Sequence, residues 1–350
     1  MNLRLKRNLS IICHNKDMVE LRQGVFNTTS IYIEDDDKKG KLSEVLLYMN
    51  GEFKLSEIAK KVKISRVELE KLVDILLEKG VLEDRSSNLL DYYIESQLVV
   101  NNINNSLSKK YEKNEIVIFS NGKLSQKIIH SLAELEVLNR DIVVQVINTD
   151  DKLYSIIFDK ENLFHQDSEL FYKSMESFEN LKNKFVIFIQ NNIDLLATEK
   201  LSYIANEIGC SYMMLSIDGP MLLIGPTVIP KRTACYKCFE KRIMMNLSRL
   251  DVYKNYKNAL IANQVYEVNS FIEPVAANIL ISHGISEILN FIFTGSNFTL
   301  NKVLTIYLPT MELSFREILR LPNCEVCAPN NITSDSELHF ELKKLIKEII

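Results

Sequence analysis

The chain has 350 residues, a formal net charge of −4 and 25% charged residues. A single hydrophobic core stops growing at roughly 250–300 residues, so the length predicts two or three domains. The small negative charge gives no reason to expect nucleic acid or an anionic membrane as a partner. With 10 glycines in the chain, a function built on several glycine-rich phosphate loops is disfavoured.

The N-terminus and the apolar runs indicate a cytoplasmic protein. The sequence MNLRLKRNLSIICHN is basic, and its short apolar run lacks the h-region of a signal peptide. No apolar run reaches the length of about 18 residues that a membrane span needs. The most apolar long stretch, 266–295, carries Glu273, His283 and Glu287 and predicts a buried helix. In the cytoplasm, the six cysteines are expected to be thiols or metal ligands.

Residues 1–85 have the pattern of a winged helix-turn-helix domain. Short apolar runs between polar turns predict strands over 9–14, 18–24 and 28–35. The helices and their signals are 41–51, ending at Gly51; 56–62, capped by Ser56; and 65–80, with a Ser65–Glu68 capping box and Gly80 at its C-cap. A last strand is predicted over 81–84.

Many domains of this kind bind DNA, but the charges of the third helix argue against that function. A helix that enters the major groove should be net basic, because phosphate contacts dominate the affinity. The helix over 65–80 instead carries three basic and four acidic side chains: Arg66, Lys71 and Lys79 against Glu68, Glu70, Asp74 and Glu78. DNA binding is therefore a minor alternative.

The pattern changes after residue 85. Residues 86–114 are polar and rich in asparagine, which predicts a linker helix. From residue 115 apolar strands alternate with helices, so an α/β domain with a partly parallel sheet is predicted over 115–330. The tail, 331–350, has an amphipathic helical pattern that could pack on the core or on a partner.

Two Cys-x-x-Cys pairs, Cys235 with Cys238 and Cys324 with Cys327, predict one metal site. A single pair could be a redox motif, but two pairs in one chain favour tetrahedral thiolate zinc. Four sulfur ligands leave no open position for substrate or water, so the zinc would be structural. The other two cysteines, Cys13 and Cys210, fall in predicted strands and are expected to be buried thiols.

The first turn of the α/β domain has lost the features of a nucleotide site. It reads IFSNGKLSQKI, with Gly122 alone where a G-x-G-x-x-G pattern would have three glycines. The next predicted strand ends in Asp150 and Asp151, which could bind a ribose, although acids are common at strand ends. These features favour a binding or scaffold protein over an enzyme, so bound ATP is not expected.

The stretch IGPTVIPKRTACYKCFEKR resembles the ThiF-like, ubiquitin-activating-type family, in which this region reads roughly G-P-x-x-x-P-x-x-T-x-C-Y-x-C. The matching residues are Gly225, Pro226, Pro230, Thr233, Cys235, Tyr236 and Cys238. LPNCEVC looks like the second zinc half-site of that family, and the resemblance covers about 115–330. The N-terminal winged helix is similar to the RiPP recognition element, which binds leader peptides of ribosomally made, modified peptides.

Together the two parts look like the ThiF-like partner of azoline-forming YcaO cyclodehydratases, found in the biosynthesis of thiazole/oxazole-modified bacteriocins and of thiopeptides. The resemblance implies a protein without catalytic residues that captures the leader and activates a separate YcaO protein, which cyclises Cys, Ser and Thr using ATP. It also allows a flavin-dependent azoline dehydrogenase and a second copy of this chain as partners. An adenylating ThiF-like enzyme, or a zinc-containing transcription regulator, is the alternative.

By this resemblance the leader would add as a strand to the edge of the N-terminal sheet and place apolar side chains in a groove beside the third helix. The candidate peptide-binding residues are Ser30, Ile31, Tyr32 and Ile33 on the strand, and Arg66, Leu69, Glu70 and Val73 on the helix. For Ile31, Leu69 and Val73 a purely core role is equally open, because small domains use most of their apolar residues in the core.

Overall fold

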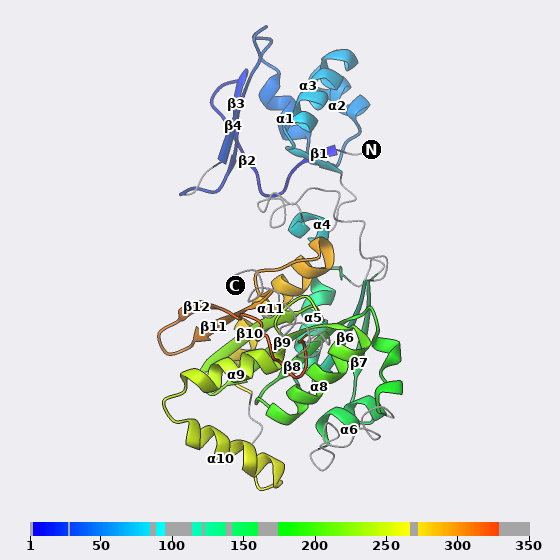
Figure 1. The fold of residues 1–350 in the computed structure, drawn as a ribbon. Helices are drawn as coiled ribbons and strands as arrows, with labels where there is room; N and C mark the ends of the chain where they lie inside the picture. The colour runs from blue at the N-terminus through cyan, green and yellow to red at the C-terminus, as the bar shows by residue number, and fades with distance from the viewer. Residues whose placement is uncertain are drawn as a thin grey trace, which may run out of the picture. The chain divides into compact units, whose positions relative to one another are not determined.

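The computed structural model describes residues 3–26, 29–84, 89–94, 114–120, 123–137, 142–159, 174–266 and 272–328. The chain divides into two compact units, which we call unit 1 (Met1–Asn102) and unit 2 (Ile103–Ile350) (Figure 1). Of the predicted linker helix over 86–114, the described part contains one short helix, α4 (Leu89–Tyr93). The predicted tail helix over 331–350 lies outside the described residues.

Unit 1 combines a three-stranded antiparallel sheet, a two-stranded pair and three packed helices. Its strands and helices are β1 (Leu3–Leu5), β2 (Ser10–Cys13), β3 (Met18–Gln23), β4 (Thr29–Glu34), α1 (Leu42–Tyr48), α2 (Leu55–Val62), α3 (Arg66–Glu78) and β5 (Leu82–Asp84). The sheet order is β2-β3-β4, and β1 pairs with β5. The element order predicted from the sequence is present, with β1 as an addition.

The helix ends of unit 1 follow from local hydrogen bonds. At the start of α3, the Glu68 amide donates to Ser65 Oγ at 3.2 Å and the Ser65 amide donates to the Glu68 carboxylate at 3.1 Å, as the predicted capping box requires. At its end Gly80 has φ +65°, a conformation that favours glycine. The predicted cap of α2 is wrong: Lys54 is the N-cap, and its amide donates to the Glu57 carboxylate at 2.9 Å.

The core of unit 1 lies between the sheet and the helices. Buried side chains from β3, α1, α2 and α3 form one apolar cluster, including Val19, Leu21, Leu46, Ile58, Leu69 and Val73. Val19 and Leu21 alternate along β3 with Glu20, so one face of the sheet is apolar and packs on the helices. On the opposite face the Glu20 carboxylate is buried and accepts from Arg22 at 2.7 Å.

Unit 2 is built on one mixed seven-stranded sheet of order β12-β11-β10-β9-β8-β6-β7 (Figure 1). The strands are β6 (Asn114–Ser120), β7 (Ile142–Ile147), β8 (Phe185–Gln190), β9 (Ser211–Asp218), β10 (Met221–Val228), β11 (Lys302–Tyr307) and β12 (Glu312–Glu317). Strands β7, β6, β8 and β9 run parallel, and β9 to β12 form an antiparallel meander. A mixed α/β fold with a partly parallel sheet is therefore confirmed.

Helices cover both faces of this sheet. They are α5 (Leu124–Glu134), α6 (Lys152–Phe158), the 3-10 turn η4 (Glu179–Leu181), α8 (Leu195–Ile208), α9 (Tyr236–Asn246), α10 (Leu250–Ile261) and α11 (Pro274–Thr294). On one face α11 contacts α5, β9 and β10, and on the other α8 contacts α6, α9 and α10. A Cβ on Gly284 of α11 would lie 2.7 Å from Leu215 of β9, so glycine permits a close crossing.

The long apolar helix α11 has the length and composition of a membrane span, but 67% of its most apolar window is buried inside the protein. Among the described residues it is the one helix with that composition. This burial fits the core helix that the sequence predicts. At its start the Glu273 carboxylate accepts from the amides of Val275 and Ala276, at 2.9 and 2.5 Å.

Asp151, a candidate ribose ligand, caps a helix that the sequence did not predict. Its carboxylate accepts from the Leu153 amide at 2.7 Å and begins α6. Strand β7 ends earlier than expected, at Ile147. Gly122, in the turn after β6, lies outside the described residues.

Candidate metal centre and peptide edge

Four cysteine sulfurs from two distant segments meet beside the sheet of unit 2. Cys235 is the N-cap of α9 and Cys238 lies in its first turn, while Cys324 and Cys327 follow β12. All four side chains are buried, and all four Sγ atoms lie within 4.8 Å of one another. The Cys235–Cys324 and Cys238–Cys327 sulfur pairs are each 3.5 Å apart.

These distances fit one tetrahedral metal ion. With Zn–S bonds of about 2.3 Å, the sulfurs of a tetrahedral site are about 3.8 Å apart. The observed separations bracket that value, and they exceed the roughly 2 Å of a disulfide bond. Four buried soft donors are the ligand set that favours Zn²⁺. The cluster is therefore compatible with the predicted zinc site.

The first half-site is positioned by the segment between β10 and α9. Thr233 Oγ1 accepts from the Ile229 amide at 2.8 Å and closes the turn that precedes Cys235. The Ala234 amide donates to Asn301 Oδ1 at 2.9 Å. Gly225, with φ +88°, lies so close to Thr299 that a Cβ would approach its Cβ to 2.7 Å. Two of the motif residues thus have a geometric reason to be glycine and threonine.

The second half-site is held by hydrogen bonds to two helices. Asn206 on α8 donates to the Val326 carbonyl at 2.6 Å, and Arg242 on α9 donates to the Leu319 carbonyl at 2.6 Å. The Leu321 amide donates to the Cys238 sulfur at 3.4 Å, a bond that favours a thiolate. The cluster thus fastens the end of the sheet meander to α8 and α9.

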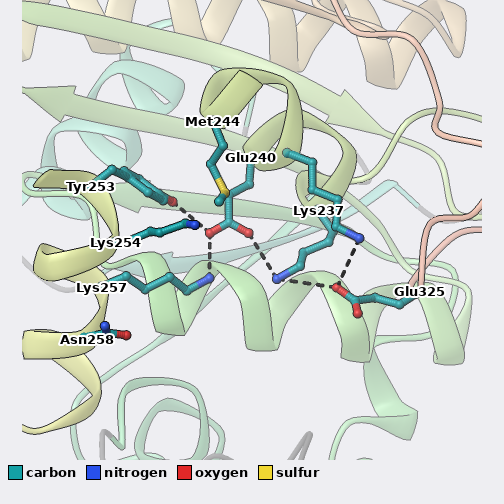
Figure 2. A pocket seen from close by; sticks show the side chains of 9 residues that line it. Lys237, Glu240, Met244, Tyr253, Lys254, Lys257, Asn258 and Glu325 are labelled. Atoms are coloured by element: carbon teal, nitrogen blue, oxygen red, sulfur yellow. Dashed lines mark hydrogen bonds and ion pairs between the residues drawn. The ribbon is translucent and has the colours of Figure 1, made fainter. Parts of the chain in front are cut away.

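A network of charged side chains, most of them buried, includes residues next to the cysteines in the sequence, and Figure 2 shows part of it. Lys237, between the first two cysteines, binds Glu199 on α8 at 2.5 Å and Glu240 on α9 at 3.1 Å. Lys257 on α10 binds the same two carboxylates at 2.8 and 2.6 Å. Glu325, between the other two cysteines, lies 3.5 Å from Lys237. This network joins α8, α9 and α10 to both half-sites.

The pKa shifts of Glu199 and Lys237 favour the charged form of each group. Burial raises the pKa of Glu199, but the hydrogen bonds from Lys237 and Lys257 outweigh burial and hold it below its usual value. Burial lowers the pKa of Lys237, but Glu199 and Glu240 outweigh it and raise that pKa. Lys237 therefore stays protonated and Glu199 stays ionised at neutral pH.

A pocket of about 350 Å³ opens beside the network, between α9 and α10. It is lined by Lys237, Glu240, Lys241, Met244, Tyr253, Lys254, Lys257, Asn258 and Glu325. Tyr253 donates to Glu240 at 2.8 Å, as Figure 2 shows. The sequence reasoning missed these charges, because each lysine and glutamate alone reads as a surface residue.

The two cysteines outside the cluster differ in exposure. Cys210 is buried, its thiol donates to the Lys184 carbonyl at 3.4 Å, and burial raises its pKa to about 12. The prediction that Cys13 is buried is wrong, because it ends β2, the outer strand of the small sheet, where its side chain is exposed.

The predicted peptide-binding residues fall into exposed and buried sets. Ser30 and Tyr32 are exposed on β4, whereas Ile31 and Ile33 are half-buried against the core of unit 1. On α3, Arg66 and Glu70 are exposed and bind each other at 2.7 Å. Leu69 and Val73 are 0% and 5% exposed. In this structure those two residues have the core role that the sequence left open.

The outer edge of β4 carries main-chain groups that pair with no described strand. The Asp35 amide donates to the Asp17 carbonyl at 2.9 Å. Because pairs alternate in an antiparallel ladder, the odd-numbered residues of β4 bond to β3 and the amides of Ser30, Tyr32 and Glu34 point outward. Beyond β4, Lys39 binds Glu68 of α3 at 2.6 Å. The segment that follows β4 thus contacts the first turn of α3 through this ion pair.

No protein-family model and no curated protein matches the sequence. Solved structures share its fold. The heterocyclase TruD is similar with a TM-score of 0.60 and 16% identity over 93% of this chain and 43% of that one. A heterocyclase in complex with substrate and cofactor is similar with a TM-score of 0.61 and 13% identity, over 95% of this chain and 40% of that one.

The microcin C7 biosynthetic enzyme MccB, in complex with N-formylated MccA, is similar with a TM-score of 0.50 and 14% identity. The match covers 94% of this chain and 100% of that one. This chain therefore spans about two-fifths of the length of the two heterocyclases and the full length of MccB. At these identities the likeness shows a shared fold.

Proposed function

We propose that this chain is a leader-peptide-binding subunit that presents a ribosomally made precursor to a separate YcaO cyclodehydratase for ATP-dependent azoline formation. The observation that carries the proposal is the open edge of β4, with outward amides at Ser30, Tyr32 and Glu34. The fold shared with two heterocyclases and with the microcin C7 biosynthetic enzyme MccB supports it. In this proposal unit 1 acts as a winged-helix recognition element.

Strand addition explains how such an edge captures a peptide. Each added residue pair supplies main-chain hydrogen bonds irrespective of the peptide's sequence, and the neighbouring side chains select among sequences. The exposed ring of Tyr32 offers an apolar surface on one face of the edge. On the other face, Ile31 and Ile33 are half-buried and can contact alternate peptide side chains.

In this proposal the metal is structural zinc. The four sulfurs are buried and lie within 4.8 Å of one another, so four thiolates would occupy all positions of a tetrahedral Zn²⁺ and leave none for a substrate. When bound, the ion would cross-link α9 to the segment after β12, and the cysteines would serve as its ligands. The chemistry of cyclisation then belongs to the partner.

Binding of a fluorescent leader peptide to the full chain tests the proposal. The probe is the leader of any short Cys/Ser/Thr-rich peptide that sequencing finds encoded beside the gene, and binding is followed by anisotropy. Ser30→Pro removes one outward amide, and its ring also obstructs the edge of β4. Both effects should weaken leader binding, together by at least about tenfold. The matched control Ser30→Thr keeps the amide and should bind as the unmodified chain does.

An adenylating enzyme is a second candidate, favoured by one observation. Gln190 Nε2, at the end of β8, and Ser216 Oγ on the adjacent β9 are buried and have no hydrogen-bond partner among the described residues. They lie toward the carboxyl ends of parallel strands, where α/β sheets commonly bind ligands. ATP–pyrophosphate exchange by the purified chain would support this candidate, and absence of ATP binding in calorimetry would remove it.

A further inference from the structure

The large sheet of unit 2 ends in an edge strand that lacks most of the usual protective features. β12, with sequence ELSFRE, pairs with β11 on one side and with no described strand on the other (Figure 1). Edge strands are usually protected by charged side chains, especially lysine, by proline or by a bulge. β12 carries the charged residues Glu312, Arg316 and Glu317 but no proline or lysine, and its register with β11 is continuous over six pairs. Such an edge is a template for another strand.

The apolar side chains of β12 continue the core face of the sheet. Phe315 lies opposite Leu304, and Leu313 lies opposite Ile306. Those β11 partners are 5% and 1% exposed, whereas Leu313 and Phe315 are 53% and 57% exposed. The apolar band beside α11 therefore extends beyond the helix cover to the edge of the sheet.

The ladder fixes which main-chain groups of β12 point outward. The Ile318 amide donates to the Asn301 carbonyl at 2.7 Å, in line with the β11–β12 register. Because hydrogen-bonded and non-hydrogen-bonded pairs alternate, the main-chain groups of the even-numbered residues bond to β11. The main-chain groups of Leu313, Phe315 and Glu317 therefore face outward. A second strand must align its outward residues with these.

We propose that β12 pairs antiparallel with β12 of a second copy of this chain, about a two-fold axis at Ser314. In this register Leu313 of each copy faces Phe315 of the other as hydrogen-bonded pairs. Glu312 of each copy faces Arg316 of the other as close, non-hydrogen-bonded pairs. The interface is self-complementary, as a two-fold axis requires.

Charge complementarity selects this register and this occupant. Neither Glu312 nor Arg316 has an ion-pair partner within the described part of the chain. Shifting by one allowed step in one direction places Leu313 opposite Glu317, and in the other it places Glu312 opposite Ser314. The register centred on Ser314 thus satisfies both charges and both apolar residues at once.

Cysteine cross-linking of the full chain tests the register. In a Cys13→Ser background, which removes the exposed thiol, Ser314→Cys should give a disulfide-linked dimer on mild oxidation, because the two positions face each other across the axis. Arg316→Cys is the matched control and should stay monomeric on denaturing gels. Cross-linking through Arg316→Cys instead would overturn the proposal.

Sedimentation over a concentration series tests the interface itself. Arg316→Glu places like charges opposite each other twice and should raise the dimer dissociation constant about tenfold or more. Glu312→Arg combined with Arg316→Glu should restore it, while Glu317→Arg, which leaves both pairs intact, should change little. A chain that is monomeric throughout, or a β12 edge covered by another part of the same chain, would contradict the proposal.

Discussion

Cys238 is a residue whose role in a metal site could be predicted from the sequence. Its spacing from Cys235 and the second pair predicted a common site, and the four sulfurs do meet. Lys237 lies between the first two cysteines and Glu325 between the other two, yet the sequence alone did not predict that these two residues pair. Whether a spacer residue is buried depends on α8 and α10, which reach the site from other parts of the chain.

Replacing Cys238 with serine should remove the metal and destabilise unit 2. A hydroxyl is a poor zinc ligand, and structural zinc contributes directly to folding. We expect loss of about one zinc per chain in elemental analysis, a fall in melting temperature on the order of 10 °C, and poor solubility. Cys210→Ser, at a buried thiol outside the cluster, should retain the zinc. A Cys238→Ser protein that is folded, zinc-loaded and monodisperse but inactive would refute a structural role.

Lys257→Met should destabilise the protein by about 3 kcal/mol, because it leaves Glu199 and Glu240 buried with one cation fewer. Lys254 lines the same pocket and forms no ion pair in the described chain. The matched variant Lys254→Met should therefore change the free energy of unfolding by less than about 0.5 kcal/mol. Urea unfolding monitored by circular dichroism measures both. Equal effects would show that the network contributes no net stability.

At the scale of elements, the sequence predicted the ends of α3, which are set by hydrogen bonds between residues close in the chain. The capping box at Ser65 and the glycine after α3 were read correctly, because each acts within a few residues. Strand β1 was missed because it is defined by pairing with β5, about 80 residues away. Strands β11 and β12 were also missed, although Leu313 and Phe315 of β12 alternate with polar residues as in a half-buried strand.

Gly225→Ala tests the close approach that shapes the segment before the cysteines. The new Cβ would lie 2.7 Å from Thr299 Cβ and 2.8 Å from the Lys302 carbonyl oxygen, at a φ that disfavours alanine. We expect a loss of about 2–3 kcal/mol in thermal or urea unfolding. Gly219→Ala, also at positive φ but with open space around it, should cost about 1 kcal/mol. Similar losses for both would show that the clash is relieved elsewhere.

At the scale of the whole molecule, composition and alternation predicted an α/β protein, and the mixed sheet confirms it. The chain divides near the expected linker, between Asn102 and Ile103. The peptide-binding candidates could not be sorted by sequence alone. Ile31, Leu69 and Val73 have the same apolar character, and the packing of α3 decides that the last two are buried.

Stability against pH should reflect the buried charges. The folded-state pKa of Glu199 is lowered, so its contribution is present above the unfolded pKa of about 4.3 and is lost as pH falls through the folded value. The pKa of Lys237 is raised, so its contribution is full below the unfolded pKa of about 10.4 and is lost as pH rises through the folded value. The contribution of these two groups to the free energy of unfolding should thus be level from about pH 5 to 10 and fall below about pH 4. Glu199→Gln should weaken the acid dependence, and an unchanged profile would contradict this origin.

Hydrogen–deuterium exchange of the full chain with the leader peptide tests the central claim most directly. If the leader adds to β4, the amides of Ser30, Tyr32 and Glu34 should exchange more slowly when it is bound, because they then donate to the peptide. The amides of Ile31 and Ile33, which already face β3, should change less. Protection confined to unit 2, or no protection at saturating leader, would contradict leader capture at this edge.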